Sequence, residues 1–173
     1  MRYLLKQDLF SFGDDFTIKN ERGDAVYKVD GKAFTLLREK LAFEDMQGRE
    51  LAFIREKLIA LTTSYEILRD GKLAAVVKKD LINLFRVGFT VDVPGPDDLE
   101  ATGSLLDHEY TFKRGGRVVA TVSKRWFSFT DTYGVDVESG EDDVLILAST
   151  VVIDMVCHAD KEKKPAHVHT PGD

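Results

Sequence analysis

Cysteine is nearly absent from this 173-residue sequence, which contains a single one, Cys157. One cysteine excludes a disulfide bond within the chain, a pattern that suits a reducing compartment. The formal net charge of -6 also lacks the strong basic excess that marks most nucleic-acid-binding domains. We therefore expect a cytoplasmic protein, free or peripheral at a membrane, with no nucleic-acid partner.

Long hydrophobic runs are missing as well. The N-terminus has no apolar run of signal-peptide length. The longest apolar stretch, residues 144–157, is interrupted by Ser149, Thr150 and Asp154. As a helix it would span roughly 21 Å, which is shorter than the ~30 Å hydrocarbon core of a bilayer. We expect no transmembrane segment.

Motifs of the common catalytic and nucleotide-binding sites are also absent, including the G-x-S-x-G elbow, the P-loop and H-E-x-x-H. The acidic run 138–143 does not fit a calcium loop of the EF-hand type, because Asp136 stands where that loop requires glycine. Helix capping explains the same acidic residues. His167 and His169 could form a metal cluster with Cys157 and His158, but the first pair lies in a tail that we expect to be disordered. The sequence therefore predicts no catalytic residue, no bound metal and no cofactor.

What the sequence does contain is a repeated hairpin. In each unit, apolar and polar residues alternate, the chain turns at a glycine, and the alternation resumes. The units start at Phe16, Leu41, Tyr65 and Tyr110 and turn at Gly23, Gly48, Asp70-Gly71 and Gly115-Gly116. With a last strand at residues 133–137 and the β-rich segments between the units, the strands number on the order of a dozen. Such a set leaves exposed edges unless it closes. We predict a mainly β fold, an antiparallel closed β-barrel of about 12 strands.

The C-terminal apolar segment is the predicted content of this barrel. Gly140-Glu141-Asp142-Asp143 is typical of a helix start, and residues 144–157 are apolar on nearly all sides, so a helix there must be buried. A short buried strand is the alternative, because many of these residues are β-branched. A barrel of this size also needs something to fill it. We expect one domain over residues 1–158 with a C-terminal core helix, followed by a disordered tail over residues 159–173.

Several segments together resemble one known family. They are Phe10-Ser11 with Asp14, Val119–Ser128, Asp131–Val135, and Gly140–Asp143 with the apolar run that ends at Asp154. The chain is similar to the LURP-one-related family of the Tubby C-terminal-like superfamily, which includes the phospholipid scramblases. The resemblance covers the chain to about His158 and implies a twelve-stranded barrel around a C-terminal helix. Tubby relatives suggest binding of anionic lipid headgroups, and scramblase relatives suggest lipid movement, although neither activity follows from a shared fold.

Two places stand out as candidate sites. Lys124, Arg125 and Trp126 combine cations with an aromatic ring, a composition that suits a phosphate headgroup at an interface. The alternative is that one face of this strand packs in the core while the charges are solvated or pair with Asp131. Asp154 lies within the apolar segment, so its carboxylate needs a donor. We expect it to be a structural anchor between helix and barrel, bound by a lysine, an arginine or backbone amides.

These observations favour a non-enzymatic binding or interaction module whose partner is anionic phospholipid or another protein. One alternative is scramblase-like phospholipid translocation, which would require the helix to leave the barrel. Another is an enzyme or a carrier that uses the barrel interior, which would require a cavity lined by converging polar groups. The oligomeric state stays open.

Overall fold

The computed structural model describes residues 1–7, 16–31, 40–59, 62–83, 86–124 and 132–163, and all statements of structure below refer to them. The strands are β1 (Arg2–Gln7), β2 (Phe16–Asn20), β3 (Ala25–Gly31), β4 (Lys40–Asp45), β5 (Glu50–Ile59), β6 (Thr62–Arg69), β7 (Lys72–Asn83), β8 (Arg86–Asp92), β9 (Leu99–Ser104), β10 (Glu109–Arg114), β11 (Arg117–Ser123) and β12 (Thr132–Val137). A 3₁₀ turn, η1 (Leu105–Asp107), precedes β10, and the helix α1 (Asp143–Lys163) follows β12.

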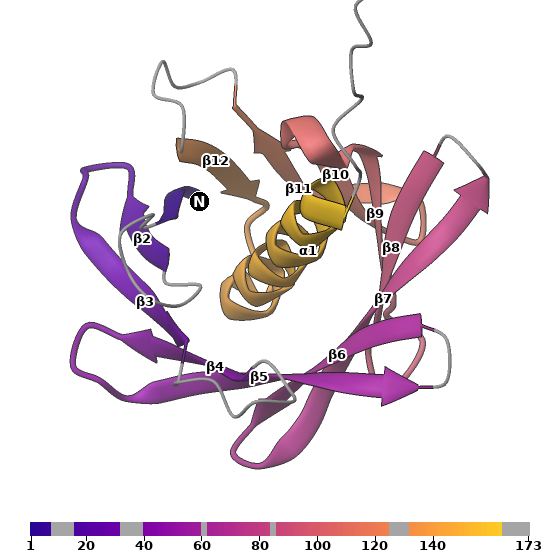
Figure 1. Cartoon of the computed structure of the whole chain (residues 1–173). Coiled ribbons are helices and arrows are strands. Elements are labelled where there is room, and N and C mark those ends of the chain that lie inside the picture. Colours follow the sequence, from indigo (N-terminus) through magenta and orange to yellow (C-terminus); the bar gives the residue numbers. More distant parts are fainter. Residues whose placement is uncertain (8–15, 32–39, 60–61, 84–85, 125–131, 164–173) are drawn as a thin grey trace, which may run out of the picture.

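The strands form a closed antiparallel barrel, as predicted (Figure 1). Each strand pairs with its neighbours in sequence, and β1 pairs with β12 to close the ring, with Tyr3 opposite Val135. The hairpin repeat is confirmed at β2–β3, β4–β5, β6–β7 and β10–β11. Between Arg69 and Lys72, Asp70 and Gly71 both have positive φ, 48° and 72°, as a two-residue hairpin turn requires. Closure removes the strand edges that would otherwise invite aggregation.

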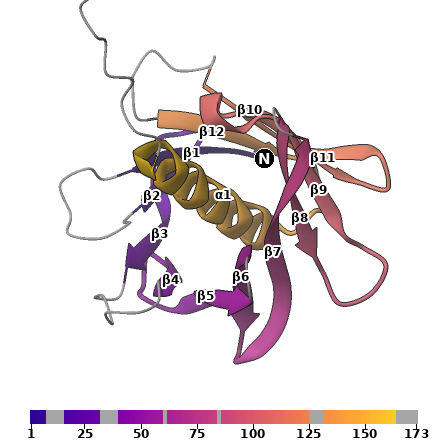
Figure 2. The ribbon, with the colours of Figure 1, turned by 45° about the vertical axis from the view of Figure 1, so that its right-hand side comes forward.

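The interior of the barrel is occupied by α1, which runs along it from one end to the other (Figures 1 and 2). Ile146, Leu147 and Val151 are at most 1% exposed, so they form a single core with the inward faces of the strands. The predicted core helix is confirmed, and the alternative of a buried strand is wrong. The helix continues to Lys163, past the boundary expected at residue 158. Residues 164–173 of the expected tail lie outside the described residues.

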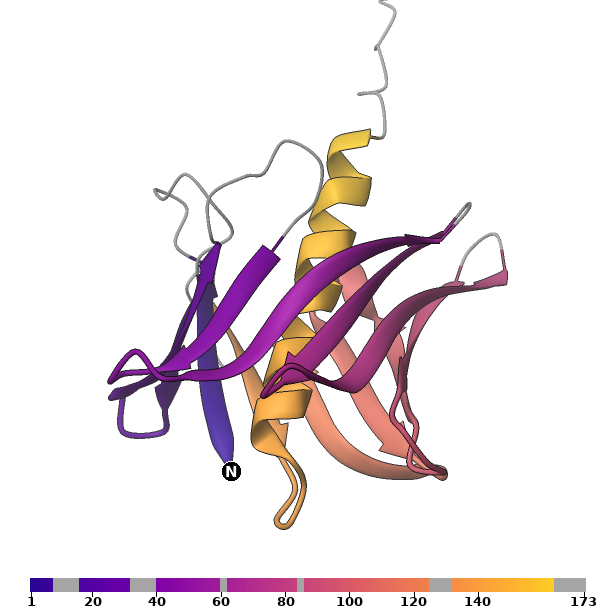
Figure 3. The same cartoon turned by 90° about the horizontal axis from the view of Figure 1, so that it is seen from below.

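The two ends of the barrel differ, and Figure 3 shows them side-on. The tight glycine turns and the start of α1 lie at one end, which we call the turn end. The C-terminal half of α1, η1 and the end of β11 lie at the other, which we call the helix-exit end. At the turn end the acidic run begins the helix, since Asp142 accepts the N–H of Leu145 at 3.1 Å and binds Arg69 through two contacts of 2.6 Å. Glu141 binds Arg114 and Arg117.

Four strands lie outside the hairpin repeat, namely β1, β8, β9 and β12, and two of them, β1 and β9, have no clear local signal. β1 pairs with β12, at the far end of the sequence, so no local turn signals it. β9 buries only Leu99 and Ala101 and contains Gly103, which weakens its alternating pattern. No helix in the described part of the chain combines the length and the hydropathy that crossing a bilayer requires.

Candidate functional site

The predicted cationic cluster is described at one residue, Lys124. It follows β11 directly, is half-exposed, and its backbone N–H donates to Oε1 of Glu109 at 3.0 Å. The Ser123 hydroxyl lies 2.9 Å from both oxygens of the same carboxylate. Glu109 is the first residue of β10, so its side chain ties the end of β11 to the start of β10. Arg125, Trp126 and the predicted partner Asp131 lie outside the described residues.

Asp154 is buried inside the barrel, with 2% of its surface exposed. Its Oδ1 lies 3.3 Å from Nε2 of His108, which is also buried. His108 follows η1 in a left-handed conformation, φ 52°, with its N–H donating to the Leu105 carbonyl. In this conformation the His108 side chain reaches Asp154 on the helix. We expected a lysine, an arginine or backbone amides beside Asp154, and the structure places an imidazole there.

A second imidazole approaches the same carboxylate. His158 lies one helical turn after Asp154, so both side chains project from the same face of α1. Its ring meets that of His108 edge-on, with centroids 6.2 Å apart. One ligand atom from each of His108, Asp154 and His158 lies within 4.8 Å of the other two. His158 is half-exposed, which places this group between the core and the helix-exit end.

Two tyrosines complete what we call the His108 cluster: His108, Tyr110, Tyr133, Asp154 and His158. The Tyr133 ring stacks on His108 with centroids 4.4 Å apart. Burial raises the pKa of both tyrosines well above its usual value, and the negative charge of Asp154 raises it further. For Tyr110 the nearby Thr150 hydroxyl offsets a small part of that rise in pKa. Neither tyrosine hydroxyl forms a hydrogen bond of acceptable geometry with a described residue.

The chemistry of the His108 cluster depends on its imidazoles and carboxylate and on whether nearby hydroxyl and thiol groups are already bound or buried. Imidazoles beside a carboxylate serve proteins as acid–base groups, as metal ligands or as buried hydrogen-bonded anchors. The Ser123 hydroxyl is bound to Glu109, the Ser149 hydroxyl donates to the Leu145 carbonyl, and Cys157 is buried, with 6% of its surface exposed. The arrangement of His108, Asp154 and His158 is one that can anchor helix to wall or hold a metal ion.

His108 is the residue that sequence reasoning missed. It lies between Asp107 and Glu109 in a segment without any motif, so nothing local marks it. The signal that could have found part of the cluster is the spacing of Asp154 and His158, because residues four apart share a face of a helix. Their partner His108 could not be found in this way, since its position depends on how η1 packs against α1.

A single barrel of twelve antiparallel strands closed around its own C-terminal helix defines the structural class of this protein. The chain belongs to the LURP-one-related family, whose model matches residues 1–154. That range includes His108 and Asp154 and ends before His158. The family resemblance expected from the sequence is thus confirmed.

Proteins similar to the chain include one from a bacterium and one from a plant. The chain is 31% identical over 159 residues to the uncharacterised protein YxjI of Bacillus subtilis (strain 168), a match that covers 92% of this chain and 95% of that protein. The X-ray structure of a protein from Arabidopsis thaliana has a TM-score of 0.65 with 18% sequence identity, covering 90% of this chain and 91% of that one. At this level of identity the second likeness concerns the fold.

Proposed function

We propose that this protein is a non-enzymatic binding module that docks its helix-exit end on anionic phospholipid headgroups at a membrane surface. The observation that carries the proposal is the filled interior of the barrel. Leu147, Ala148 and Val151 of α1 have no exposed surface, so in the described part of the chain the helix takes the space in which a barrel of this size would hold a ligand. A partner then meets the outer surface or the ends.

The helix-exit end has side chains suited to such a surface. Lys124 is half-exposed, and its ammonium group has no ion pair among the described residues. Lys6 of β1, which is exposed, lies opposite the first residue of β12. Leu106 of η1 is 42% exposed. It lies three positions before Glu109, whose carboxylate accepts the backbone N–H of Lys124. Cations beside an exposed apolar side chain suit an anionic interface, and Arg125 and Trp126 extend that composition along the chain.

Peripheral docking is favoured over lipid translocation by the same helix. If α1 moved into a bilayer, the buried carboxylate of Asp154 would enter lipid at a high cost. The inward faces of the strands would lose the side chains that cover them. Docking through the helix-exit end leaves the core intact.

Flotation with lipid vesicles tests the proposal. The protein is mixed with phosphatidylcholine vesicles with or without phosphatidylserine or a phosphoinositide, at low and high salt. We expect flotation with the anionic vesicles that weakens at high salt, because salt screens exposed charges. The variant Lys124→Glu/Arg125→Glu should lose it.

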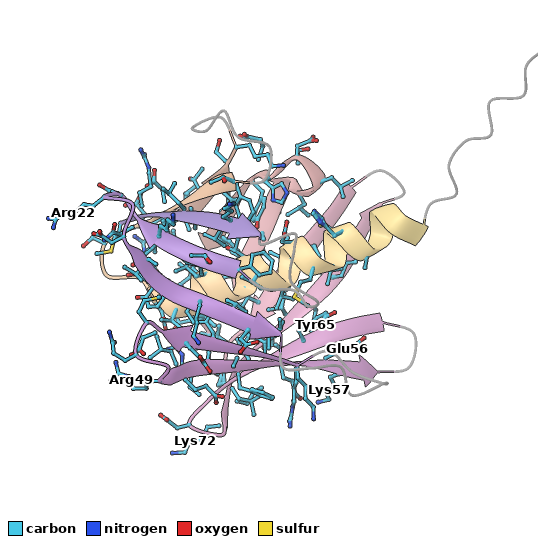
Figure 4. The ribbon with its side chains drawn as sticks, turned by 60° about the vertical axis from the view of Figure 1, so that its left-hand side comes forward. Arg22, Arg49, Glu56, Lys57, Tyr65 and Lys72 are labelled. Carbon is cyan, nitrogen blue, oxygen red and sulfur yellow. The ribbon has the colours of Figure 1, made fainter. Side chains whose placement is uncertain are left out.

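A matched control is available at the turn end. Arg22→Glu/Lys72→Glu makes the same change of charge at two exposed residues, one in the turn between β2 and β3 and the other at the start of β7 (Figure 4). We expect this control to float like the wild type. Equal loss in both variants would mean that overall charge, not the helix-exit end, drives binding. Absence of flotation with every anionic vesicle would overturn the lipid proposal and leave a protein partner as the better candidate.

A further inference from the structure

We propose that His108, Asp154 and His158 form a zinc site at the helix-exit end that fastens α1 to the barrel. The sequence alone predicted no metal, because only the fold brings His108 to the other two residues. The proposal concerns stability of the barrel and does not depend on the partner that the protein binds.

The ligand set suits zinc in type and geometry. Two imidazole nitrogens and one carboxylate oxygen are ligands that zinc takes in open sites, whereas calcium and magnesium take oxygen. Zinc–ligand bonds of about 2.0–2.2 Å place tetrahedral ligand atoms roughly 3.4 Å apart. Nε2 of His108 and Oδ1 of Asp154 are 3.3 Å apart, and all three ligand atoms lie within 4.8 Å of one another. To bring all three ligand atoms to the tetrahedral spacing, the His158 side chain would have to rotate. His158 is the half-exposed member of the three, so it has room to do so.

A simple buried ion pair explains less of what is observed. One imidazole is enough to pair with Asp154, yet a second, His158, also approaches the carboxylate. The hydroxyls of Tyr110 and Tyr133 are buried without a hydrogen-bond partner in the described structure. Both lie close enough to Asp154 for its charge to raise their pKa. A water or hydroxide in the fourth zinc position would offer these hydroxyls an acceptor, in the manner of the outer hydrogen bonds that orient metal ligands.

The position of the site determines what zinc would do. His108 leads from η1 into β10, while Asp154 and His158 lie in the second half of α1. A metal bound to both elements links barrel wall and core helix. Because the unfolded chain does not hold these ligands together, zinc binding would stabilise the folded state.

Zinc titration of metal-free protein against a chromophoric chelator tests the site, with the visible absorption of Co²⁺ as a spectroscopic probe. We expect one equivalent of zinc, a Co²⁺ spectrum typical of four-coordinate nitrogen and oxygen ligands, and a higher melting temperature with zinc. His158→Ala and His108→Ala should each weaken affinity by at least about 100-fold, since loss of an outer hydrogen bond to a ligand alone costs 10–100-fold. His158 is half-exposed, so its alanine variant should fold, which circular dichroism checks.

The tail histidines provide the control. The double variant His167→Ala/His169→Ala removes the two remaining histidines of the chain, which follow α1 in the sequence. This variant should bind zinc like the wild type. The proposal is overturned if the wild type binds no zinc, if His158→Ala binds it as tightly as the wild type, or if the tail variant loses it. The last outcome would place the metal on the tail instead.

Discussion

At Gly103 the barrel wall has no room for a side chain. The residue lies in β9 opposite Tyr110, with φ of 144°. A Cβ atom there would lie 2.6 Å from the carbonyl oxygen of Glu109 and 2.7 Å from the Cα of Tyr110. Both are backbone atoms, so they cannot rotate away. This close approach holds β9 against the part of β10 that presents the His108 cluster.

Gly103→Ala should therefore lower the free energy of unfolding by about 3 kcal/mol, through backbone strain and the displacement of β10. Gly71→Ala is the comparison, because Gly71 also has positive φ, 72°, but nothing lies within 4 Å of its Cβ position. There only the left-handed conformation costs energy, about 1 kcal/mol. Urea denaturation measures both. Equal losses would contradict the close approach.

At the scale of an element, the start of α1 is held by one arginine of the barrel wall. Arg69, the last residue of β6, binds both carboxylate oxygens of Asp142 at 2.6 Å. Burial alone would raise the pKa of Asp142, but the Arg69 guanidinium and the N–H groups of Leu145 and Val144 outweigh it, so the pKa is lowered. The charged carboxylate is thus favoured in the folded state.

The lowered pKa sets the direction of a pH dependence. Stability from Asp142 is present above the usual aspartate pKa of about 4 and is lost as pH falls through the lower pKa of the folded state. Asp142→Asn should cost about 1 kcal/mol at pH 7, a modest value because both side chains are about a third exposed. The difference from wild type should shrink in acid. Thermal unfolding between pH 7 and pH 2.5 measures it.

A surface pair gives the control for this prediction. Lys78 and Asp92 lie 2.6 Å apart with side chains 46% and 45% exposed, and Asp92 caps no helix. Asp92→Asn should change stability by no more than a few tenths of a kcal/mol at any pH. A difference between Asp142→Asn and wild type that stays constant down to pH 2.5 would show that the charge of Asp142 is not the cause.

For the whole molecule, barrel and helix share one core. Leu147, with no exposed surface, lies on α1 in the middle of the ring of strands. Leu147→Ala should lower the free energy of unfolding by about 3 kcal/mol, because it leaves a cavity that the closed wall cannot collapse into. Leu106→Ala, at a side chain 42% exposed, should cost far less. Urea denaturation measures both free energies.

Since neither part has a core without the other, strand and helix signals in circular dichroism should be lost in one transition. A helix signal that disappears first, or a Leu147→Ala variant as stable as Leu106→Ala, would contradict a shared core.

Most of the fold could be predicted from local patterns in the sequence. Alternation around Tyr65 and Ile67 with a turn at Asp70-Gly71 identifies a hairpin, because the period of two and the positive φ of the turn are properties of neighbouring residues. The all-round apolar character of residues 144–157 identifies a core helix for the same reason. β1 could not be predicted in this way, because its partner β12 is remote in the chain.

The sequence by itself therefore determined the hairpins, the closed ring that they require and the helix that fills it. It also singled out Lys124 and Asp154, one by its neighbours and the other by its charge in an apolar segment. Only the tertiary structure decided what surrounds Asp154. His108, in the turn between η1 and β10, and Tyr133 of β12 reach it from the barrel wall. Such contacts depend on how residues distant in sequence pack in space, for which no local pattern exists.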